Sequence, residues 1–512
     1  MVFKGASATR SREWPAAVTA KRRFEIPRLT FLTPGFTRRA VFLFVVAFVI
    51  YLPALRGPFF WDDDELVYLN ADVVQMRGPV HVWYNTEASD YAPLSTISYW
   101  FEWGLWKRAT LGYHVDNVLL HALNALLLWL VLERLTIPGA FLGAVLFLVH
   151  PVCVESVAWI SERRNVLSMA WYLSALLAYV EFIGTNNRRY WYTALVLFAA
   201  GLFSKAAIVI LPIVLLLLVW WVHRRLEKAD LWRVAPFAVL SLIVGMVRMW
   251  FERNRAMGNI DLHDFTWSRR LTTAGEAVWF YLGKALWPSN LTLIYPRFTE
   301  SPQLAFLTVA ALCVAVGLMV IGMRRRRGRS LAFASSYFVL ALLPSLGLAN
   351  MSYMQHANVA DHLEYLALAA PLALLAAVLA KRPRVGIPIA AAIVLVLGAV
   401  AARRAWYFGH PDELWQLTAR QNPYAWTAHE HIALHLYEKA NLTGAADAFK
   451  RSLELHPANY RAWFNLATMD QLQGRWADAI DAYSQALARR PTLDVARARI
   501  NECQRHLSPN AR

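Results

Sequence analysis

Long apolar runs separated by short polar loops dominate the chain. Many are shorter than the ~20 residues that a membrane-spanning helix needs, and they cover residues 40–55, 116–132, 138–150, 166–183, 190–203, 206–222, 233–250, 303–323, 331–348, 363–380 and 386–402. The pattern predicts an all-α, polytopic membrane domain over residues 40–404. The first run ends in acids and aromatics rather than at a small-residue cleavage site, so we expect it to be a retained helix.

Clusters of basic residues between the runs predict the orientation in the membrane. The loops "NNRRY" (186–190), "HRRLEK" (223–228), "RRRRGR" (324–329) and "KRPR" (381–384) should face the cytoplasm, together with the basic segment 1–39. About eleven crossings satisfy this rule, provided that residues 274–288 form a lateral helix along the outer surface. An odd number of crossings leaves the C-terminus outside.

A repeat with a period of 34 residues occupies the last part of the chain. Pro423, Pro457 and Pro491 recur at this spacing, as do Trp415, Phe449 and Tyr483. Thirty-four residues is the period of the tetratricopeptide repeat (TPR), a pair of packed helices. We expect a short TPR solenoid over 411–507, with a leading helix, two helix pairs and a capping helix. Such a stack has a concave surface that holds an extended peptide or, alternatively, covers the membrane domain.

Composition agrees with a membrane protein and narrows its partners. The chain has 512 residues, 57% of them hydrophobic, and a mean hydropathy of +0.34. Its net charge of +17 comes from short basic clusters between apolar runs, which argues against nucleic acid binding. The three cysteines, Cys153, Cys313 and Cys503, have no CxxC spacing, so neither a disulfide framework nor a thiolate metal site is expected.

Four acids follow the first apolar run directly, from Asp62 to Glu65. Neighbouring carboxylates at a membrane surface repel one another and lose part of their hydration, so the pKa of at least one should be raised, as a general base near neutral pH requires. A solvated loop or a weak cation site is the alternative.

Other polar residues fall on the same predicted outer side. His150, Glu155, Arg163 and Arg164 lie in one loop, and Lys205 lies at a tight corner between two runs. Basic side chains beside carboxylates suit a phosphate leaving group and a nucleophile that must lose a proton. His121, inside the second run, is better explained by an interhelical hydrogen bond than by a place in this group.

The sequence around these residues resembles a known family, the lipid-linked-sugar-dependent glycosyltransferases of the GT-C type that carry TPRs. The animal members are the transmembrane and TPR-containing O-mannosyltransferases, and the bacterial branch is more similar to this chain. The blocks that carry the resemblance are "FFWDDDELVYLNADVV" (59–74), "YAPLSTISYWFEWGLW" (91–106), "GYHVDNVLLHALNALLL" (112–128), "HPVCVESVAWISERRNVLS" (150–168), "LFSKAAIVILP" (202–212) and "YLGKALWPSNLTLIYP" (281–296).

The resemblance implies an inverting transfer of a sugar, mannose in the animal members, from a polyprenyl phosphate to a hydroxyl of a protein or envelope acceptor. The family's paired aspartates match Asp62 and Asp63, and Asp63 is the first candidate for the general base. The same comparison assigns the donor phosphate and its surroundings to seven residues: Arg163, Lys205, His150, Glu155, Asp361, His362 and Tyr365. Trp426 and Asn465 are the candidate acceptor contacts in the TPRs.

Two departures from the family pattern affect the donor site. The family's late outer loop reads Asp-Arg-Tyr-x-Tyr, whereas this chain has "ADHLEY" (360–365), so His362 replaces an arginine and contacts a phosphate only when protonated. Asn165 stands where an aspartate is common.

These departures leave a second hypothesis, a non-catalytic scaffold whose TPRs recruit envelope proteins to a membrane anchor. Convergence of Asp63, Arg163 and Lys205 on one site would favour the enzyme. A transporter is disfavoured because no mirrored inner site is visible. For the enzyme we expect a bacterial cytoplasmic membrane location with the TPRs outside. The expected ligands are the lipid-linked sugar and a protein acceptor, with no metal ligand assigned and the need for a divalent metal left open.

Overall fold

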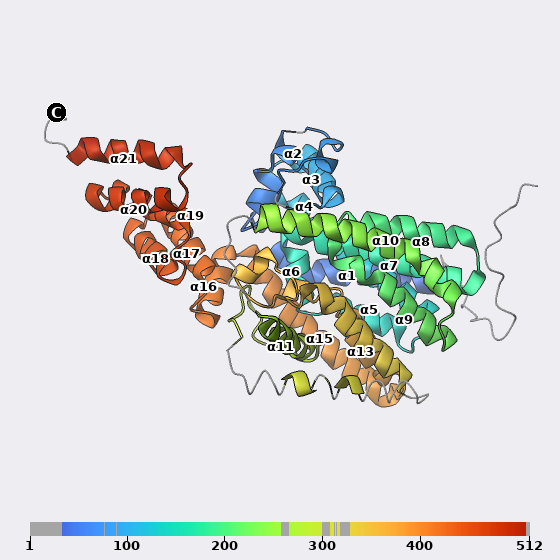
Figure 1. The fold of residues 1–512 in the computed structure, drawn as a ribbon. Helices are drawn as coiled ribbons and strands as arrows, with labels where there is room; N and C mark the ends of the chain where they lie inside the picture. Colours follow the sequence, from blue (N-terminus) through green and yellow to red (C-terminus); the bar gives the residue numbers. More distant parts are fainter. Residues whose placement is uncertain are drawn as a thin grey trace, which may run out of the picture.

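The computed structural model describes residues 33–507 except for 76, 89, 258–265, 299–307, 312, 314 and 318–327. The described residues form helices and loops and contain no strand. The predicted all-α fold with a C-terminal TPR is therefore confirmed. A helical bundle carries the solenoid α16–α21 at one end (Figure 1).

Ten of the eleven predicted apolar runs contain a described helix, and the run 303–323 lies largely outside the described residues. The helices of the bundle are α1 (Pro34–Tyr51), α4 (Thr110–Arg134), α5 (Ala140–Leu148), α7 (Arg163–Thr185), α8 (Arg188–Leu202), α9 (Leu211–His223), α10 (Lys228–Phe251), α11 (Trp267–Leu286), α13 (Arg329–Leu342), α14 (Ala369–Ala380) and α15 (Pro383–Gly409). By length and composition, six helical stretches among the described residues could each cross a membrane. The count of eleven crossings stays a prediction.

The apolar residues explain which helices lie inside the bundle. The stretches that contain α4 and α7 have most of their apolar windows buried. On α10 and α15, by contrast, large apolar side chains such as Leu242, Met249 and Leu395 are exposed. Apolar side chains exposed on long apolar helices suit contact with lipid tails rather than with water. The periphery of the bundle is therefore the face expected to meet the bilayer.

Helix α11 covers most of the stretch predicted to lie laterally. It is seen nearly end-on in Figure 1, whereas α10 is seen along its length. Its buried side chains include Ala274, Ala277, Tyr281 and Ala285, a spacing of three or four residues that puts one face of the helix against the bundle. That α11 lies along the outer surface of a membrane stays a prediction.

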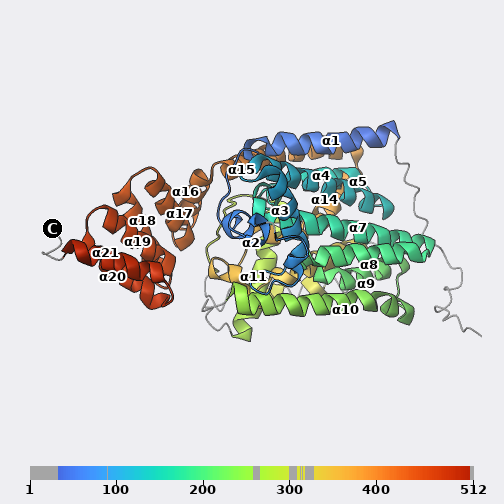
Figure 2. The same cartoon turned by 90° about the horizontal axis from the view of Figure 1, so that it is seen from above.

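The polar loops gather at the end of the bundle from which the TPRs extend. Helices α2 (Ala71–Val74), α3 (Pro93–Trp106) and α6 (Cys153–Ala158) lie there, near the end of α1 (Figure 2). The α3 start is tied to the corner after α8, since Leu94 N–H donates to Phe203 O at 3.0 Å and Ser95 Oγ donates to Ser204 O at 3.0 Å. This packing brings chain segments 50 to 200 residues apart into one region.

The solenoid consists of α16 (Pro411–Gln421), α17 (Trp426–Glu438), α18 (Leu442–Leu455), α19 (Tyr460–Leu472), α20 (Trp476–Arg489) and α21 (Asp494–Leu507). The repeated aromatics Trp415, Phe449 and Tyr483 are all buried, as packed helix pairs require. Gly474 has φ +74° in the turn between α19 and α20, where a side chain would be strained. Residues of α16 and α17 share an apolar core with the bundle, while α18–α21 have their own.

Candidate active site

The two predicted catalytic aspartates differ in their surroundings. Asp63 is fully buried and its carboxylate accepts hydrogen bonds from Phe60 N–H at 3.1 Å, from Ser161 N–H at 2.7 Å and from the Ser161 hydroxyl. Asp62 is only half-buried, and neither of its carboxylate oxygens has a hydrogen-bond partner among the described residues. Asp63 is thus held by the start of α7, whereas Asp62 can reach a substrate.

Both aspartates hold a proton more tightly than an ordinary carboxyl. Burial raises the pKa of Asp63 to about 7, although its hydrogen bonds with Ser161 and Phe60 oppose the change. Burial also raises the pKa of Asp62 to about 6, against the opposing effect of the Arg164 guanidinium. The expected raised pKa near neutral pH is present in both.

Trp61 fixes the backbone just before these acids. Its φ is +52°, in the left-handed region that a bulky side chain rarely adopts. The ring stacks on Trp159 with centroids 5.0 Å apart, and it meets the edges of His356 at 5.3 Å and Trp415 at 5.4 Å. Loop residues and the first TPR helix therefore hold a strained backbone in place.

The neighbouring arginines at the start of α7 point to different surroundings. Arg163 is buried, and its guanidinium donates to Glu102 Oε1 at 2.7 Å, to Tyr113 O at 2.9 Å and to Asn117 Oδ1. Those partners belong to α3 and α4, so Arg163 holds three helices together. Arg164 is half-buried and lies close enough to Asp62 to oppose the rise of its pKa.

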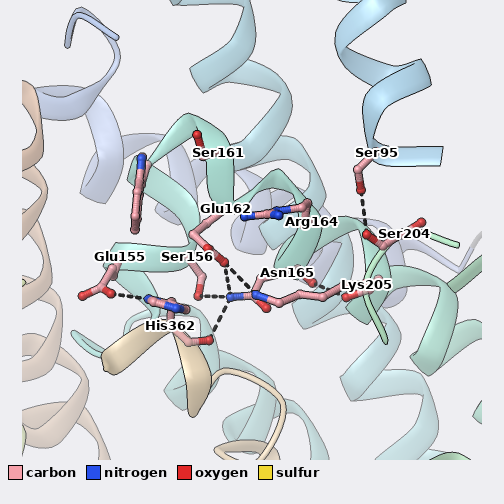
Figure 3. A network of polar contacts seen from close by, with 12 residues as sticks. Ser95, Glu155, Ser156, Ser161, Glu162, Arg164, Asn165, Ser204, Lys205 and His362 are labelled. Carbon is pink, nitrogen blue, oxygen red and sulfur yellow. Dashed lines mark hydrogen bonds and ion pairs between the residues drawn. The ribbon is translucent and has the colours of Figure 1, made fainter. Parts of the chain in front are cut away.

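Lys205 lies in a polar network with Glu162 and Asn165, drawn in Figure 3. Its ammonium is 3.0 Å from Glu162 Oε2, which also accepts from Asn165 Nδ2 at 2.6 Å. The same Asn165 amide donates to Ser156 Oγ at 3.1 Å and to the His362 carbonyl at 2.8 Å. An aspartate at position 165 could neither donate these bonds nor lie comfortably beside Glu162, which gives the asparagine a physical reason.

A second polar cluster joins Glu155, His362, Asp361 and Arg404. His362 Nδ1 lies 2.5 Å from Glu155 Oε1, and Arg404 Nη2 bridges Glu155 Oε2 at 3.2 Å and Asp361 Oδ2 at 2.7 Å. The Tyr295 hydroxyl donates to Asp361 Oδ1 at 2.7 Å. All five side chains are largely or fully buried. A protonated His362 would balance the two carboxylates together with Arg404.

Some predicted residues lie away from these clusters. His150 is buried with Nε2 3.2 Å from Ala285 O. The Tyr365 hydroxyl lies 2.8 Å from His121 Nδ1 and accepts from Asn124 at 3.1 Å, so His121 has the interhelical hydrogen bond expected of it. His150 and Tyr365 therefore act in packing in this structure.

The two candidate acceptor residues of the TPRs also differ. Trp426 is stacked between His356, at 5.2 Å, and His456, at 4.6 Å, which leaves neither ring face open. Asn465 is half-buried on α19, with no hydrogen-bond partner in the described part of the chain. Of the two, Asn465 is the side chain with polar atoms available to a ligand.

No group of three or more His, Cys, Asp or Glu side chains among the described residues could hold a metal ion. Residues that sequence analysis missed are Ser161, Arg404 and Trp61. Ser161 is a common residue type inside a recognisable block, and Arg404 lies near the end of the last apolar run. The charged position of Arg404 beside an apolar run was the one signal that could have identified it.

Known families match two parts of the chain. The family described as dolichyl-phosphate-mannose-protein mannosyltransferase matches residues 109–250, and the tetratricopeptide repeat matches residues 460–493. The chain resembles the protein O-mannosyltransferases. The match with the mannosyltransferase family includes Glu155, Arg164 and Lys205, while Asp62 and Arg404 lie on either side of it.

Individual relatives carry the same resemblance. The chain is 30% identical to a protein O-mannosyl-transferase of Caenorhabditis elegans over 28% of its length, 32% identical to Tmtc1 of Drosophila melanogaster over 26%, and 28% identical to TMTC2 of Homo sapiens over 27%. Both of the latter are named as protein O-mannosyl-transferases. The aligned part spans 23%, 17% and 18% of these relatives, respectively.

Proposed function

We propose that this protein is a multi-pass membrane glycosyltransferase that moves mannose from a polyprenyl phosphate to a hydroxyl of a protein acceptor on the outer face of a bacterial cytoplasmic membrane. The observation that carries the proposal is the pair Asp62 and Asp63. One carboxylate is open to a substrate and the other is held by three hydrogen bonds. Similarity to mannosyltransferases supports the choice of sugar.

In the proposed reaction Asp62 is the general base. It removes the proton of the acceptor hydroxyl while the oxygen attacks the anomeric carbon from the face opposite the phosphate. The new C–O bond forms as the bond from the anomeric carbon to the phosphate oxygen breaks, so the configuration inverts and polyprenyl phosphate leaves. A base with a pKa of about 6 is mostly ionised at neutral pH, as this step requires.

Asp63 takes a positioning role in this proposal, in place of the first candidacy that the sequence gave it. A fully buried carboxylate that already accepts three hydrogen bonds has no approach for a substrate hydroxyl. Through Ser161 it ties the acid stretch to the start of α7 and to the basic side chains there. Among these, we assign Lys205 and His362 to the surroundings of the donor phosphate, and Arg163 to the packing of α3 and α4.

The TPRs are proposed to bring the acceptor to Asp62. The Tyr460 hydroxyl and, at longer range, the carboxylates of Glu65 and Asp64 raise the pKa of Arg461 on α19. The solenoid therefore faces the acid stretch, and an acceptor along α19 would lie near Asn465. Glu65 and Asp64 then have a place at the entry of the acceptor.

The test is transfer by the purified full-length chain in nanodiscs, with radiolabelled polyprenyl-phosphate mannose and a fraction of envelope proteins. Wild type should label protein, and Asp62→Asn should not, with unchanged thermal midpoint. Labelling that is equal in the two would remove Asp62 from the mechanism. Failure of both proteins to transfer, over several sugar donors, would favour the non-catalytic scaffold.

A further inference from the structure

Asp90 lies between two arginines at the polar end of the bundle. Arg164 Nη1 donates to Asp90 Oδ2 at 2.6 Å, and Arg248 forms an ion pair with the other oxygen of the same carboxylate. Arg164 is in the first turn of α7 and Arg248 in the last turn of α10, while Asp90 belongs to the loop before α3. Between 16% and 19% of each side chain is exposed.

This group of three carries one more positive than negative charge. Glu252, one turn beyond Arg248, directs Oε1 to the Ser352 backbone N–H instead. The Nε–H of Arg164 is buried and has no hydrogen-bond partner among the described residues. Leaving a charged donor unpaired in a partly dehydrated place is costly, so the arrangement favours a second anion.

The surroundings identify the kind of anion. Helix α10 exposes Leu242, Met246 and Met249 on the side where we expect lipid, so a headgroup in the bilayer can approach Arg248 directly. Arg164 also lies near Asp62, and it acts with burial to lower the pKa of Lys205. An anion bound by the two arginines would therefore lie beside the proposed base and be accessible from the membrane.

We propose that Arg164 and Arg248, bridged by Asp90, bind the phosphate of a lipid, the donor if the proposed function is right. The phosphate enters beside Asp90 and accepts the free Nε–H of Arg164 together with an N–H of Arg248. A monoanionic phosphodiester makes the group of three and its ligand electrically neutral. The site adds two cations, one from α10, to those expected from the sequence.

A simpler explanation is that Asp90 only pins its loop to the bundle. The same loop offers a matched example of such a pin, because Glu87 pairs with Arg255 at 2.8 Å. There a single arginine meets a single, mostly exposed carboxylate. Two arginines on one carboxylate exceed what pinning needs, and Arg255 provides the control for the test.

The test measures binding without turnover. Full-length protein in phosphatidylcholine nanodiscs is titrated with undecaprenyl monophosphate, and bound lipid is counted by native mass spectrometry. We expect Arg248→Gln and Arg164→Gln each to weaken binding about tenfold to a hundredfold, the loss typical of a hydrogen bond between charged groups. Arg255→Gln should bind within about twofold of wild type. Asp90→Asn should bind at least as tightly, since it removes a competing negative charge.

Equal binding by wild type and Arg248→Gln would overturn the proposal, as would equal losses in Arg248→Gln and Arg255→Gln. Competition by millimolar inorganic phosphate at equal potency would overturn the assignment to a lipid. If Arg248→Gln does not fold, Arg248→Lys keeps the charge but loses the planar donor pair, and it should still bind several-fold more weakly. Binding that depends on Arg248 without any sugar transfer would sustain this site while refuting the proposed function.

Discussion

The assignment of the base to Asp62 rather than Asp63 leads to opposite expectations for two nearly isosteric changes. Asp62→Asn removes the base but breaks no hydrogen bond, because the carboxylate has none among the described residues. Asp63→Asn keeps the acceptor toward Ser161 but turns an amide NH₂ toward Phe60 N–H, now 3.1 Å from a carboxylate oxygen. The first change should affect the chemical step and the second the local fold.

The expected magnitudes follow from these contacts. Loss of a general base lowers the rate by about 10²- to 10⁴-fold, or about 3 to 5 kcal/mol in the barrier. One buried N–H without an acceptor costs about 1 to 3 kcal/mol of stability. Asp62→Asn should therefore lose nearly all transfer at an unchanged thermal midpoint. Asp63→Asn should lower the midpoint and keep part of the transfer.

Initial rates of mannose transfer and thermal midpoints in the same nanodiscs would decide between the two aspartates. Asp64→Asn is a matched control, since Asp64 lies in the same acid stretch and its Oδ1 accepts only from Glu65 N–H in the next residue. A variant Asp62→Asn with wild-type rates would refute the reasoning. So would an Asp63→Asn variant that is inactive at an unchanged midpoint.

Three further predictions concern pH and the buried contacts. Transfer should rise with pH and level off above an apparent pKa of about 6, because burial raises the pKa of Asp62 to about 6 and only its ionised form accepts a proton; a rate independent of pH between 5 and 7.5 would contradict this. Arg404→Met should destabilise the protein by ~3–5 kcal/mol, because two buried carboxylates lose their shared cation, whereas exposed Arg403→Met serves as a control with little effect on the thermal midpoint. Trp415→Ala removes the TPR ring that contacts Trp61 at 5.4 Å, so transfer should fall even with acceptors too small to reach α19, and an unchanged rate would show that this contact does not support the acid stretch.

Local pattern determined much of the architecture. Hydropathy alone identified the apolar runs, since a membrane helix must bury its backbone polar groups within itself and present apolar side chains to lipid. The 34-residue spacing of Trp415, Phe449 and Tyr483 identified the helix pairs of the solenoid for a similar reason, because each pair buries its aromatic against the next. The acid stretch stood out because charge beside an apolar run is costly.

Tertiary structure decided the roles of individual side chains. Arg163 and Arg164 are neighbours in sequence, but successive residues of a helix point about 100° apart, and only packing put Glu102 and Asn117 beside the first and Asp90 beside the second. The partners of Arg404 lie 43 and 249 residues away. The sequence by itself therefore determined which segments are helical and which end of the bundle is polar, both consequences of local hydrophobicity. Which carboxylate is open and which arginine is free depend on contacts between distant segments, and these exist only once the helices have packed.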